Sequence, residues 1–274
     1  MALRPHQWIK NLLIFAAPIA SVSTFDVLLQ VALGFIGFCL VSSAGYLIND
    51  WKDRENDKLH LLKQARPFAK GVLTRVDFFL MCTTCVIFAV IIAHHLSFEF
   101  LLCLALYFSN SIFYTFKLKN IPVLEIAVIA NGFLLRALAG SVIIRLQPTG
   151  WFLVVVYFGS IFMITNKRIA EISNNYRLKT RNVLSYYSSE FLEFLSTMSA
   201  AITILTYALW VFENHPNSLL AKCTIMFFSI CIFIYKWIIT NSMIEAPEHA
   251  IFQNYAFLIL AGITVIFLVL VFYL

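Results

Sequence analysis

Residues 27–58 read VLLQVALGFIGFCLVSSAGYLINDWKDRENDK, and this stretch decides the class of fold. Its first part, Val27–Ile48, carries no charged residue. It is long enough for a helix that crosses a bilayer, which takes about 20 mostly apolar residues. Its second part, from Asn49 onward, is dense in carboxylates. The stretch therefore predicts a transmembrane helix that leaves the membrane as an acidic segment.

The rest of the chain repeats the apolar half of this pattern. Hydrophobic residues make up 61% of the 274 residues and charged residues only 12%, whereas a soluble domain has about 25% charged residues. Helices satisfy their backbone hydrogen bonds inside hydrocarbon, and the apolar runs lack the short alternating strands of a barrel. We expect an all-α, polytopic membrane protein with one domain over residues 1–274.

Nine apolar runs are candidate transmembrane helices. The first contains Pro18, which predicts a kink or a tilt. The runs are Ile9–Ser23, Val27–Ile48, Val72–Ala93, Phe98–Thr115, Val123–Ile144, Trp151–Thr165, Phe191–Phe212, Leu219–Thr240 and Phe252–Phe272.

The basic residues indicate how these helices are oriented. The formal net charge is +6, and most of the 20 Lys and Arg residues fall in the segments that alternate spans place on the side of the N-terminus. Such residues are enriched in cytoplasmic loops. We therefore expect a cytoplasmic N-terminus and an outer C-terminus. We expect the bilayer as a partner and no nucleic acid, and the number of subunits is left open.

Three carboxylates follow the second apolar run. On a continuing helix, Asp50, Asp53 and Asp57 are spaced i, i+3 and i+7 and share one face. Asn49 lies one turn before Asp53. Carboxylate oxygens at this density suit Mg²⁺, which combines one or two carboxylates with substrate phosphate oxygens. The alternative is a solvated acidic helix end.

A basic loop comes directly after the carboxylates. It contains Lys58, His60, Lys63 and Arg66. Bases beside a metal-binding segment make sense if both hold one Mg²⁺–diphosphate, because the bases then bind the phosphoryl oxygens. The alternative is that the bases only set the orientation in the membrane.

These residues carry a resemblance to a known family. Asn49-Asp50-x-x-Asp53-x-x-x-Asp57, followed by Arg66-Pro67 and Gly71, resembles the first aspartate motif of the UbiA superfamily of intramembrane prenyltransferases. That family has nine transmembrane helices around a central cavity. The resemblance implies this fold, an enzyme, and Mg²⁺ as the cofactor.

Four further motifs narrow the resemblance to the decaprenyl-phosphate phosphoribosyltransferase branch. It implies transfer of 5-phosphoribose from phosphoribosyl diphosphate to a polyprenyl phosphate, with release of diphosphate, for cell-envelope glycan precursors. The motifs are Arg4-Pro5-x-Gln7-Trp8-x-Lys10-Asn11, Leu118-Lys119-x-x-Pro122-Val123-Leu124-Glu125, Gly132-Phe133-x-x-Arg136-Ala137-x-Ala139-Gly140 and Phe158-Gly159-Ser160-x-Phe162-Met163-x-x-x-Lys167-Arg168-x-x-Glu171.

The chain departs from the family pattern at several points. Prenyl-diphosphate users carry a second DxxxD motif near the fifth span, where this chain has Glu125 and then Ile129. The missing acid argues against prenyl transfer to an aromatic acceptor, which stays the alternative function. Two signatures of the branch are only partly matched, at Lys58-Leu59-His60-Leu61 and at Ala246-Pro247-Glu248. A transporter for an anionic metabolite is a third possibility.

The fifth span holds two ionisable residues, Glu125 and Arg136, which are about 16 Å apart on one helix face. Charges within a span usually face a cavity or a partner, so we expect this face to line the cavity, and a structural ion pair is the alternative. Lys167 could bind phosphate or pair with Glu171, and Tyr114 could be a ligand or an interface anchor.

The predicted site follows from these motifs. Its catalytic residues are Asp50, Asp53, Asp57 and Glu125, and its metal ligands are Asn49, Asp50, Asp53 and Asp57. Its substrate and phosphate ligands are Lys10, Asn11, Asn49, Lys58, His60, Lys63, Arg66, Tyr114, Lys119, Arg136, Lys167 and Arg168.

Overall fold

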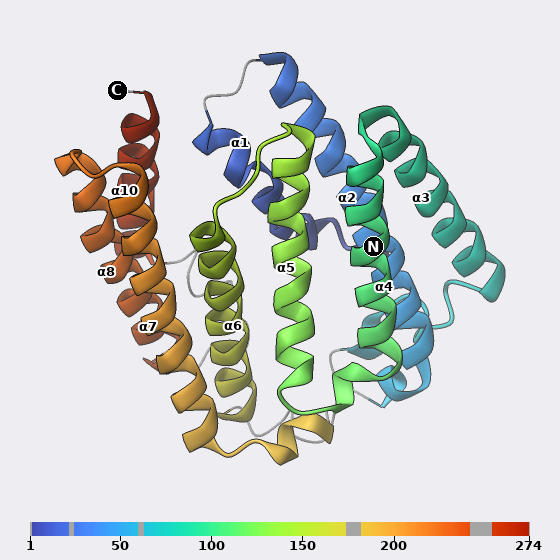
Figure 1. Cartoon of the computed structure of the whole chain (residues 1–274). Helices are drawn as coiled ribbons and strands as arrows, with labels where there is room; N and C mark the ends of the chain where they lie inside the picture. Colours follow the sequence, from blue (N-terminus) through green and yellow to red (C-terminus); the bar gives the residue numbers. More distant parts are fainter. Residues whose placement is uncertain (1, 22–24, 60–62, 174–181, 242–253, 274) are drawn as a thin grey trace. The chain divides into compact units, whose positions relative to one another are not determined.

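The computed structural model describes residues 2–21, 25–59, 63–173, 182–241 and 254–273, and these residues form helices and connecting loops with no strand (Figure 1). The predicted all-α class is confirmed. The elements are η1 (Pro5–Phe15), α1 (Ala16–Ala20), α2 (Phe25–Lys58), η2 (Lys63–Ala65), α3 (Arg75–Leu96), α4 (Phe98–Phe116), η3 (Leu118–Asn120), α5 (Leu124–Ile143), α6 (Gly150–Ser173), η5 (Asn182–Tyr186), α7 (Ser189–Asn214), α8 (Leu219–Asn241) and α10 (Tyr255–Tyr273).

The chain packs as two compact units. Unit 1 comprises residues 1–18 and 23–147, and unit 2 comprises residues 19–22 and 148–274. Unit 1 therefore holds η1 and α2 to α5, whereas unit 2 holds α6 to α10. The expectation that residues 1–274 act as one domain stays a prediction.

Seven helices of the described part, α2 to α8, are long and apolar enough to cross a membrane. The chain is thus a multi-pass membrane protein, but the predicted number of nine spans is not confirmed. The difference lies at both ends of the chain, where α10 is a further apolar helix and the first predicted span, Ile9–Ser23, is not one continuous α-helix. The helical segment at the N-terminus begins earlier than predicted, at Pro5, as a 3₁₀ helix. It becomes α-helical only at Ala16.

The 3₁₀ geometry of η1 has a packing reason. Three residues per turn align side chains three positions apart, and Trp8, Asn11 and Ile14 follow this spacing. Trp8 Nε1 donates to Ser43 Oγ at 3.1 Å, and Asn11 and Ile14 are buried. Proline at the first helical position has no N–H to leave unsatisfied, which suits Pro5. One edge of η1 thus points into unit 1 along its whole length.

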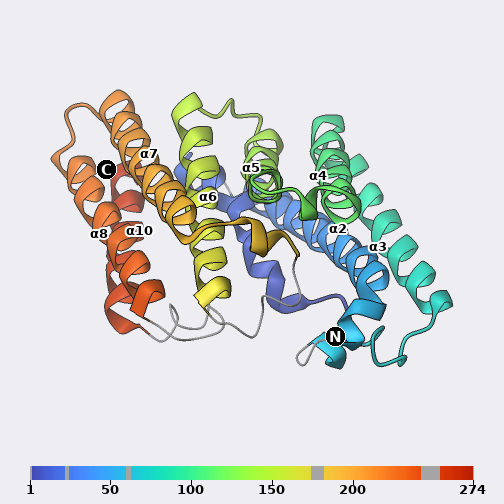
Figure 2. The ribbon, with the colours of Figure 1, turned by 90° about the horizontal axis from the view of Figure 1, so that it is seen from below.

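Helix α2 is the element around which unit 1 is built, because it packs against η1, α3, α4 and α5 (Figure 2). Phe38 lies at this contact, with its ring centroid 5.9 Å from that of Phe100 and 5.3 Å from that of Tyr107, both on α4. Helix α3 begins with a capping box, in which Asp77 Oδ2 accepts from Thr74 N at 2.7 Å. The loop that carries Arg66 therefore ends at a capped helix N-terminus.

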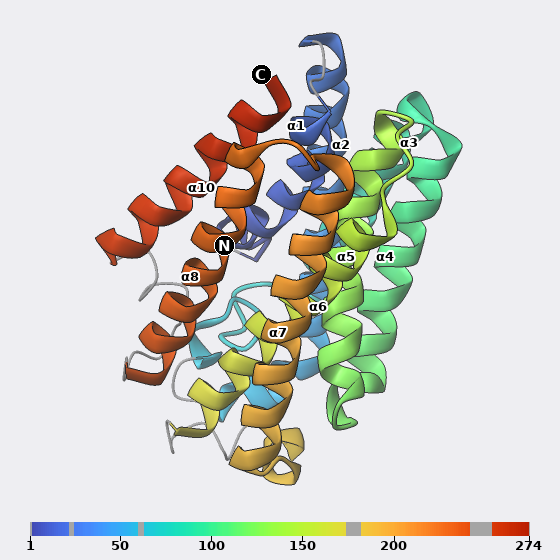
Figure 3. The same cartoon turned by 60° about the vertical axis from the view of Figure 1, so that its left-hand side comes forward.

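In unit 2, α7 packs along α6, and α8 packs against both α7 and α10 (Figure 3). Small residues face each other at the α6–α7 contact, where a Cβ on Gly159 would lie 3.5 Å from Thr203 Cγ2. Such residues let helix backbones approach closely inside a membrane. Tyr207 on α7 and Thr224 on α8 share a hydrogen bond of 2.7 Å, so polar pairs also tie these helices.

At Gly140, α5 lies very close to the backbone of η1, which gives a test of the fold. A Cβ at this position would lie 1.9 Å from the carbonyl oxygen of Ile14, a backbone atom that cannot turn away. We expect Gly140→Ala to lower the free energy of unfolding by about 1–3 kcal/mol, as overpacking does. Gly262→Ala in α10, where a Cβ would meet no other described part of the chain within 4 Å, is the matched control. Equal thermal midpoints of the two purified variants would contradict this packing.

Candidate functional site

The acidic segment remains helical, because α2 continues without a break from its apolar part to Lys58. The predicted common face of the three carboxylates is therefore real. Asp50 and Asp57 are 3% and 4% exposed, so both are buried, whereas Asp53 is half-buried. A solvated acidic helix end does not describe these two carboxylates, which need cationic partners.

Two arginines supply the positive charge. Arg66 Nη1 donates to Asp50 Oδ1 at 3.0 Å and to Asp57 Oδ2 at 2.7 Å, so one guanidinium nitrogen lies between the two carboxylates. Arg4 Nη2 contacts both oxygens of Asp50, at 2.6 and 2.9 Å. Arg4 also stacks over the ring of Tyr46. The carboxylate pair Asp50–Asp57 is thus enclosed by cations from two segments far apart in sequence.

Asp53 takes a different partner. Its Oδ1 accepts from Lys119 Nζ at 2.5 Å, and Lys119 belongs to η3, directly after α4. One residue earlier on α2, Lys52 donates to the carbonyl oxygens of Thr115 and Phe116 at 3.0 and 3.1 Å. A lysine at the last carbonyls of a helix satisfies groups that have no partner within it. These contacts fix the end of α4 against the acidic part of α2.

The turn between Lys119 and α5 is strained. Val123 has φ 66° and ψ −48°, and Leu124 N donates to Pro122 O at 2.8 Å. This is the rare γ-turn with positive φ, which a β-branched residue adopts only where its surroundings impose it. The turn starts α5 at Leu124 and places Glu125, which is fully buried, in the first turn of that helix. Strain of this kind concentrates at functional sites.

Arg136, three turns further along α5, is buried in a neutral polar network. Its Nε donates to Asn11 Oδ1, its Nη1 to Gly132 O and its Nη2 to Tyr107 Oη, each at 2.7 Å. Among the residues that the structure describes, no carboxylate forms an ion pair with Arg136, so the structural ion pair considered above is not found there. A buried charge without a counter-charge is costly in a membrane protein and marks a binding site by default.

Unit 2 carries two of the predicted bases, Lys167 and Arg168, on α6. Arg168 is buried and donates to Glu171 Oε2 at 2.7 Å, and Lys167 is half-buried. Next to them, Asn166 Oδ1 accepts from Ser196 Oγ on α7 at 3.2 Å and from Lys236 Nζ on α8 at 3.0 Å. The inner polar residues of α6 thus belong to a network within unit 2.

The other described residues of the predicted set are less buried. Asn49, Lys10, Lys63 and Tyr114 are half-buried. Lys58 is exposed and pairs with Glu55 at 2.8 Å. His60 lies outside the described residues. Of the predicted set, the structure brings together Asp50, Asp57 and Arg66, a second group of Asp53 and Lys119, and a third group of Asn11 and Arg136.

Arg4 was not among the predicted site residues, although it belongs to one of the motifs. Its contact with Asp50 joins positions 46 residues apart, and no helical periodicity relates the two. Its backbone has φ 49°, in the left-handed region, and η1 begins at the next residue, Pro5. Tyr107 was missed for a similar reason, because a tyrosine in an apolar run reads as packing.

The donor set of the carboxylate pair fits a divalent cation of the Mg²⁺ type. Asp50 and Asp57 already share one positively charged nitrogen, that of Arg66, and carboxylate oxygens are the ligands that Mg²⁺ prefers. The described residues contain no cluster of three or more His, Cys, Asp or Glu side chains that could hold a metal alone. The protein therefore offers two carboxylates together, and substrate oxygens or water would complete the coordination.

Comparison with known proteins gives consistent matches across the chain. The model of the UbiA prenyltransferase family matches residues 12–259. A decaprenyl-phosphate phosphoribosyltransferase of Mycolicibacterium smegmatis is 36% identical over 90% of this chain and 83% of its own length. One of Corynebacterium glutamicum is 37% identical over 79% of this chain and 68% of its own length.

The fold also matches solved structures. A UbiA homologue from Archaeoglobus fulgidus, solved with GPP and Mg²⁺, superimposes with a TM-score of 0.78. The match covers 99% of this chain and 98% of that protein at 17% sequence identity. At this identity the likeness concerns the fold alone.

The bridge made by Arg66 can be measured with a double-mutant cycle. We expect Arg66→Met to lower the free energy of unfolding by about 1–3 kcal/mol, because it leaves buried Asp57 unpaired beside Asp50. Adding Asp57→Asn should recover part of the loss, with a coupling of at least about 0.5 kcal/mol. The exposed pair Glu55→Gln and Lys58→Met is the control, with a coupling near zero. Strictly additive effects of the Arg66 and Asp57 variants would refute the bridge.

Proposed function

The chain belongs to the UbiA prenyltransferase family, and from this premise we propose that it transfers 5-phosphoribose from phosphoribosyl diphosphate to a polyprenyl phosphate. The observation that carries the proposal is the buried pair Asp50–Asp57 with Arg66 between its carboxylates. It supplies both an acidic metal site and bases beside it. The names of relatives that are 35–37% identical to most of the chain support the same reaction.

In this proposal, Asp50 and Asp57 would hold Mg²⁺, and Asn49 and Asp53 are the further metal ligands that the sequence predicts. When bound, Mg²⁺ would neutralise the charge that develops on the leaving diphosphate. A metal held by few protein ligands leaves positions for phosphate oxygens, which is how Mg²⁺ usually binds at such sites. The acidic residues of this chain then serve the donor and need not touch the lipid.

The cations around the pair bind the donor's phosphoryl oxygens. Arg4 and Arg66 already form charge-assisted hydrogen bonds to carboxylate oxygens, and guanidinium groups bind phosphate oxygens through hydrogen bonds of the same kind. Lys119, held by Asp53, adds a third cation. Lys58, Lys63 and His60 extend this basic segment, and Lys167 and Arg168 of α6 stay proposed phosphate ligands.

The lipid phosphate needs a separate cation inside the membrane, and we assign Arg136 to it. Its guanidinium is buried without a counter-charge among the described residues, and Asn11 and Tyr107 fix its orientation. An anionic phosphate would supply the missing charge. Lys10, Tyr114 and Glu125 belong to the same proposed cavity.

The chemistry is a displacement at ribose C1. A lipid phosphate oxygen attacks C1 and forms the new C–O bond, while the bond from C1 to diphosphate breaks and diphosphate leaves with the electron pair. The attacking oxygen is already anionic at neutral pH, so no general base is required. The protein contributes positioning of two anions and stabilisation of the leaving charge.

We place the protein in the bacterial inner membrane with the N-terminus and the acidic segment on the cytoplasmic side and the C-terminus outside. The excess of Lys and Arg on one side of the predicted spans supports this orientation. A water-soluble donor would then reach the site from the cytoplasm, and a polyprenyl phosphate from the bilayer. The two units would act as one catalytic domain.

The purified protein tests the proposal directly. With labelled phosphoribosyl diphosphate, decaprenyl phosphate and Mg²⁺, we expect a labelled lipid, and removal of Mg²⁺ by a chelator should abolish its formation. Asp57→Asn should lower kcat at least about 100-fold, the effect of losing one key electrostatic contact. Glu55→Gln, on the exposed face of the same helix segment, should retain activity.

Two results would overturn this function. One is prenyl transfer from a prenyl diphosphate to an aromatic acceptor, with no phosphoribosylated lipid. The other is Asp57→Asn protein that is folded and fully active.

A further inference from the structure

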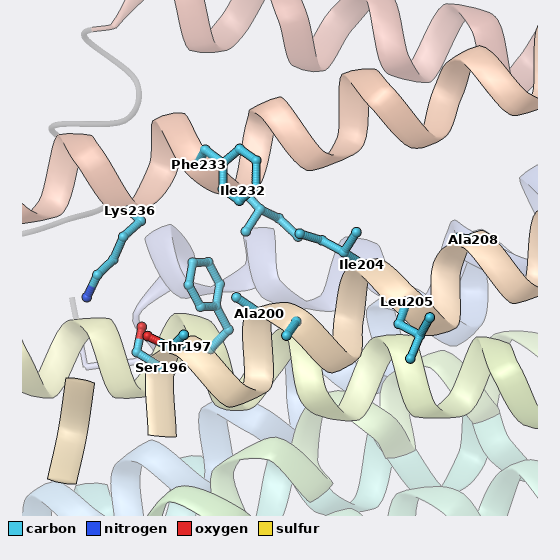
Figure 4. Close-up of a pocket in the computed structure, with 11 residues that line it drawn as sticks. Ser196, Thr197, Ala200, Ile204, Leu205, Ala208, Ile232, Phe233 and Lys236 are labelled. Carbon is cyan, nitrogen blue, oxygen red and sulfur yellow. The ribbon is translucent and has the colours of Figure 1, made fainter. Parts of the chain in front are cut away.

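Unit 2 contains an apolar groove that the proposed reaction does not use. It has a volume of about 480 Å³ and lies between α7 and α8 (Figure 4), with Phe162 of α6 also in its lining. Ala200, Ile204 and Leu205 line it from α7, and Ile232 and Phe233 line it from α8. Leu205 and Phe233 are 60% and 61% exposed, so the walls of the groove reach the surface of unit 2. Hydrocarbon can therefore enter from the side.

One end of the groove is polar. Lys236 lines it there together with Ser196 and Thr197, and the Lys236 side chain extends toward these two hydroxyl residues (Figure 4). The opposite end, around Ala208, has only apolar side chains. The polarity of the groove thus matches that of a lipid, because one end is charged and the rest is apolar.

The position of Lys236 is set by a buried residue. Asn166 is fully buried, and its Oδ1 accepts from both Lys236 Nζ and Ser196 Oγ while its Nδ2 donates to Phe162 O at 2.8 Å. This one amide therefore connects α6, α7 and α8. Lys236 is preplaced at the end of the groove and does not depend on a ligand for its conformation.

Lys236 can accept an additional anion. Its ammonium has three hydrogens, and among the described residues Asn166 Oδ1 and Glu193 Oε2 take two of them, at 3.0 and 2.7 Å. The Glu193 side chain is 47% exposed, and an ion pair with so exposed a partner contributes little stability. A phosphate oxygen can thus bind Lys236 beside Glu193 or in its place.

We propose that this groove binds an anionic membrane phospholipid, with its phosphate on Lys236 and Thr197 and one acyl chain along α7 and α8. Apolar walls at the surface of a membrane protein are covered by hydrocarbon, and basic residues between transmembrane helices bind anionic head groups. When a phosphate displaces Glu193, the single positive charge of Lys236 matches the single negative charge of a phosphodiester. The doubly charged phosphate of a polyprenyl phosphate would need more cations. The proposal does not rest on the transferase activity.

Native mass spectrometry of the intact protein in detergent tests the site. We expect phosphatidylglycerol to bind more tightly than phosphatidylcholine with the same acyl chains. Lys236→Gln should reduce this preference about fivefold, the contribution of one lysine near a membrane surface, and Lys236→Arg should keep it. The matched control is Lys222→Gln, which removes the same charge from the other end of α8 outside the groove.

A second variant tests the chain-binding part. Ala201 is an exposed residue that lines the groove, so Ala201→Phe should fill the groove without disturbing the core and should weaken binding of both lipids. Unchanged phosphatidylglycerol binding in Lys236→Gln would overturn the proposal. Normal binding of both lipids by the Ala201→Phe variant would also overturn it. So would mass spectra in which the unsubstituted protein carries polyprenyl phosphate but no phospholipid.

Discussion

A positive charge between two buried carboxylates is the constraint on which unit 1 depends. Asp50 and Asp57 lie two turns apart on α2 and are almost inaccessible, and buried carboxylates need cationic partners. Arg66 and Arg4 provide these cations and thereby attach the loop before α3 and the segment before η1 to the same helix face. The contacts that compensate the carboxylate charges are thus the same contacts that hold these two segments against α2.

Much of this arrangement could be predicted from local sequence. Helix α4 was expected at Phe98–Thr115 and spans Phe98–Phe116, because apolar length and flanking polar residues define a membrane helix. The common face of Asp50 and Asp57 follows from helical spacing, and the neighbouring base Arg66 follows from its position in the next loop. Each of these inferences uses residues close together in the chain.

Long-range contacts and unusual backbone geometry could not be predicted in this way. The contacts of Arg4 with Asp50, of Lys119 with Asp53 and of Arg136 with Asn11 depend on tertiary packing. The 3₁₀ form of η1 arises because its buried edge must meet α2 and Gly140 of α5, which no propensity scale records. The groove at Lys236 also needs three helices at once, joined by Asn166.

The central claim is that the carboxylate pair of α2 holds a divalent ion together with the donor's diphosphate. With Mn²⁺ in place of Mg²⁺, electron–nuclear double resonance can detect this contact. Phosphorus bound through oxygen to Mn²⁺ gives a ³¹P hyperfine coupling. With phosphoribosyl diphosphate present, the account predicts this coupling in the intact protein and its loss when Asp50→Asn and Asp57→Asn are combined. The same coupling in that folded double variant would contradict the account.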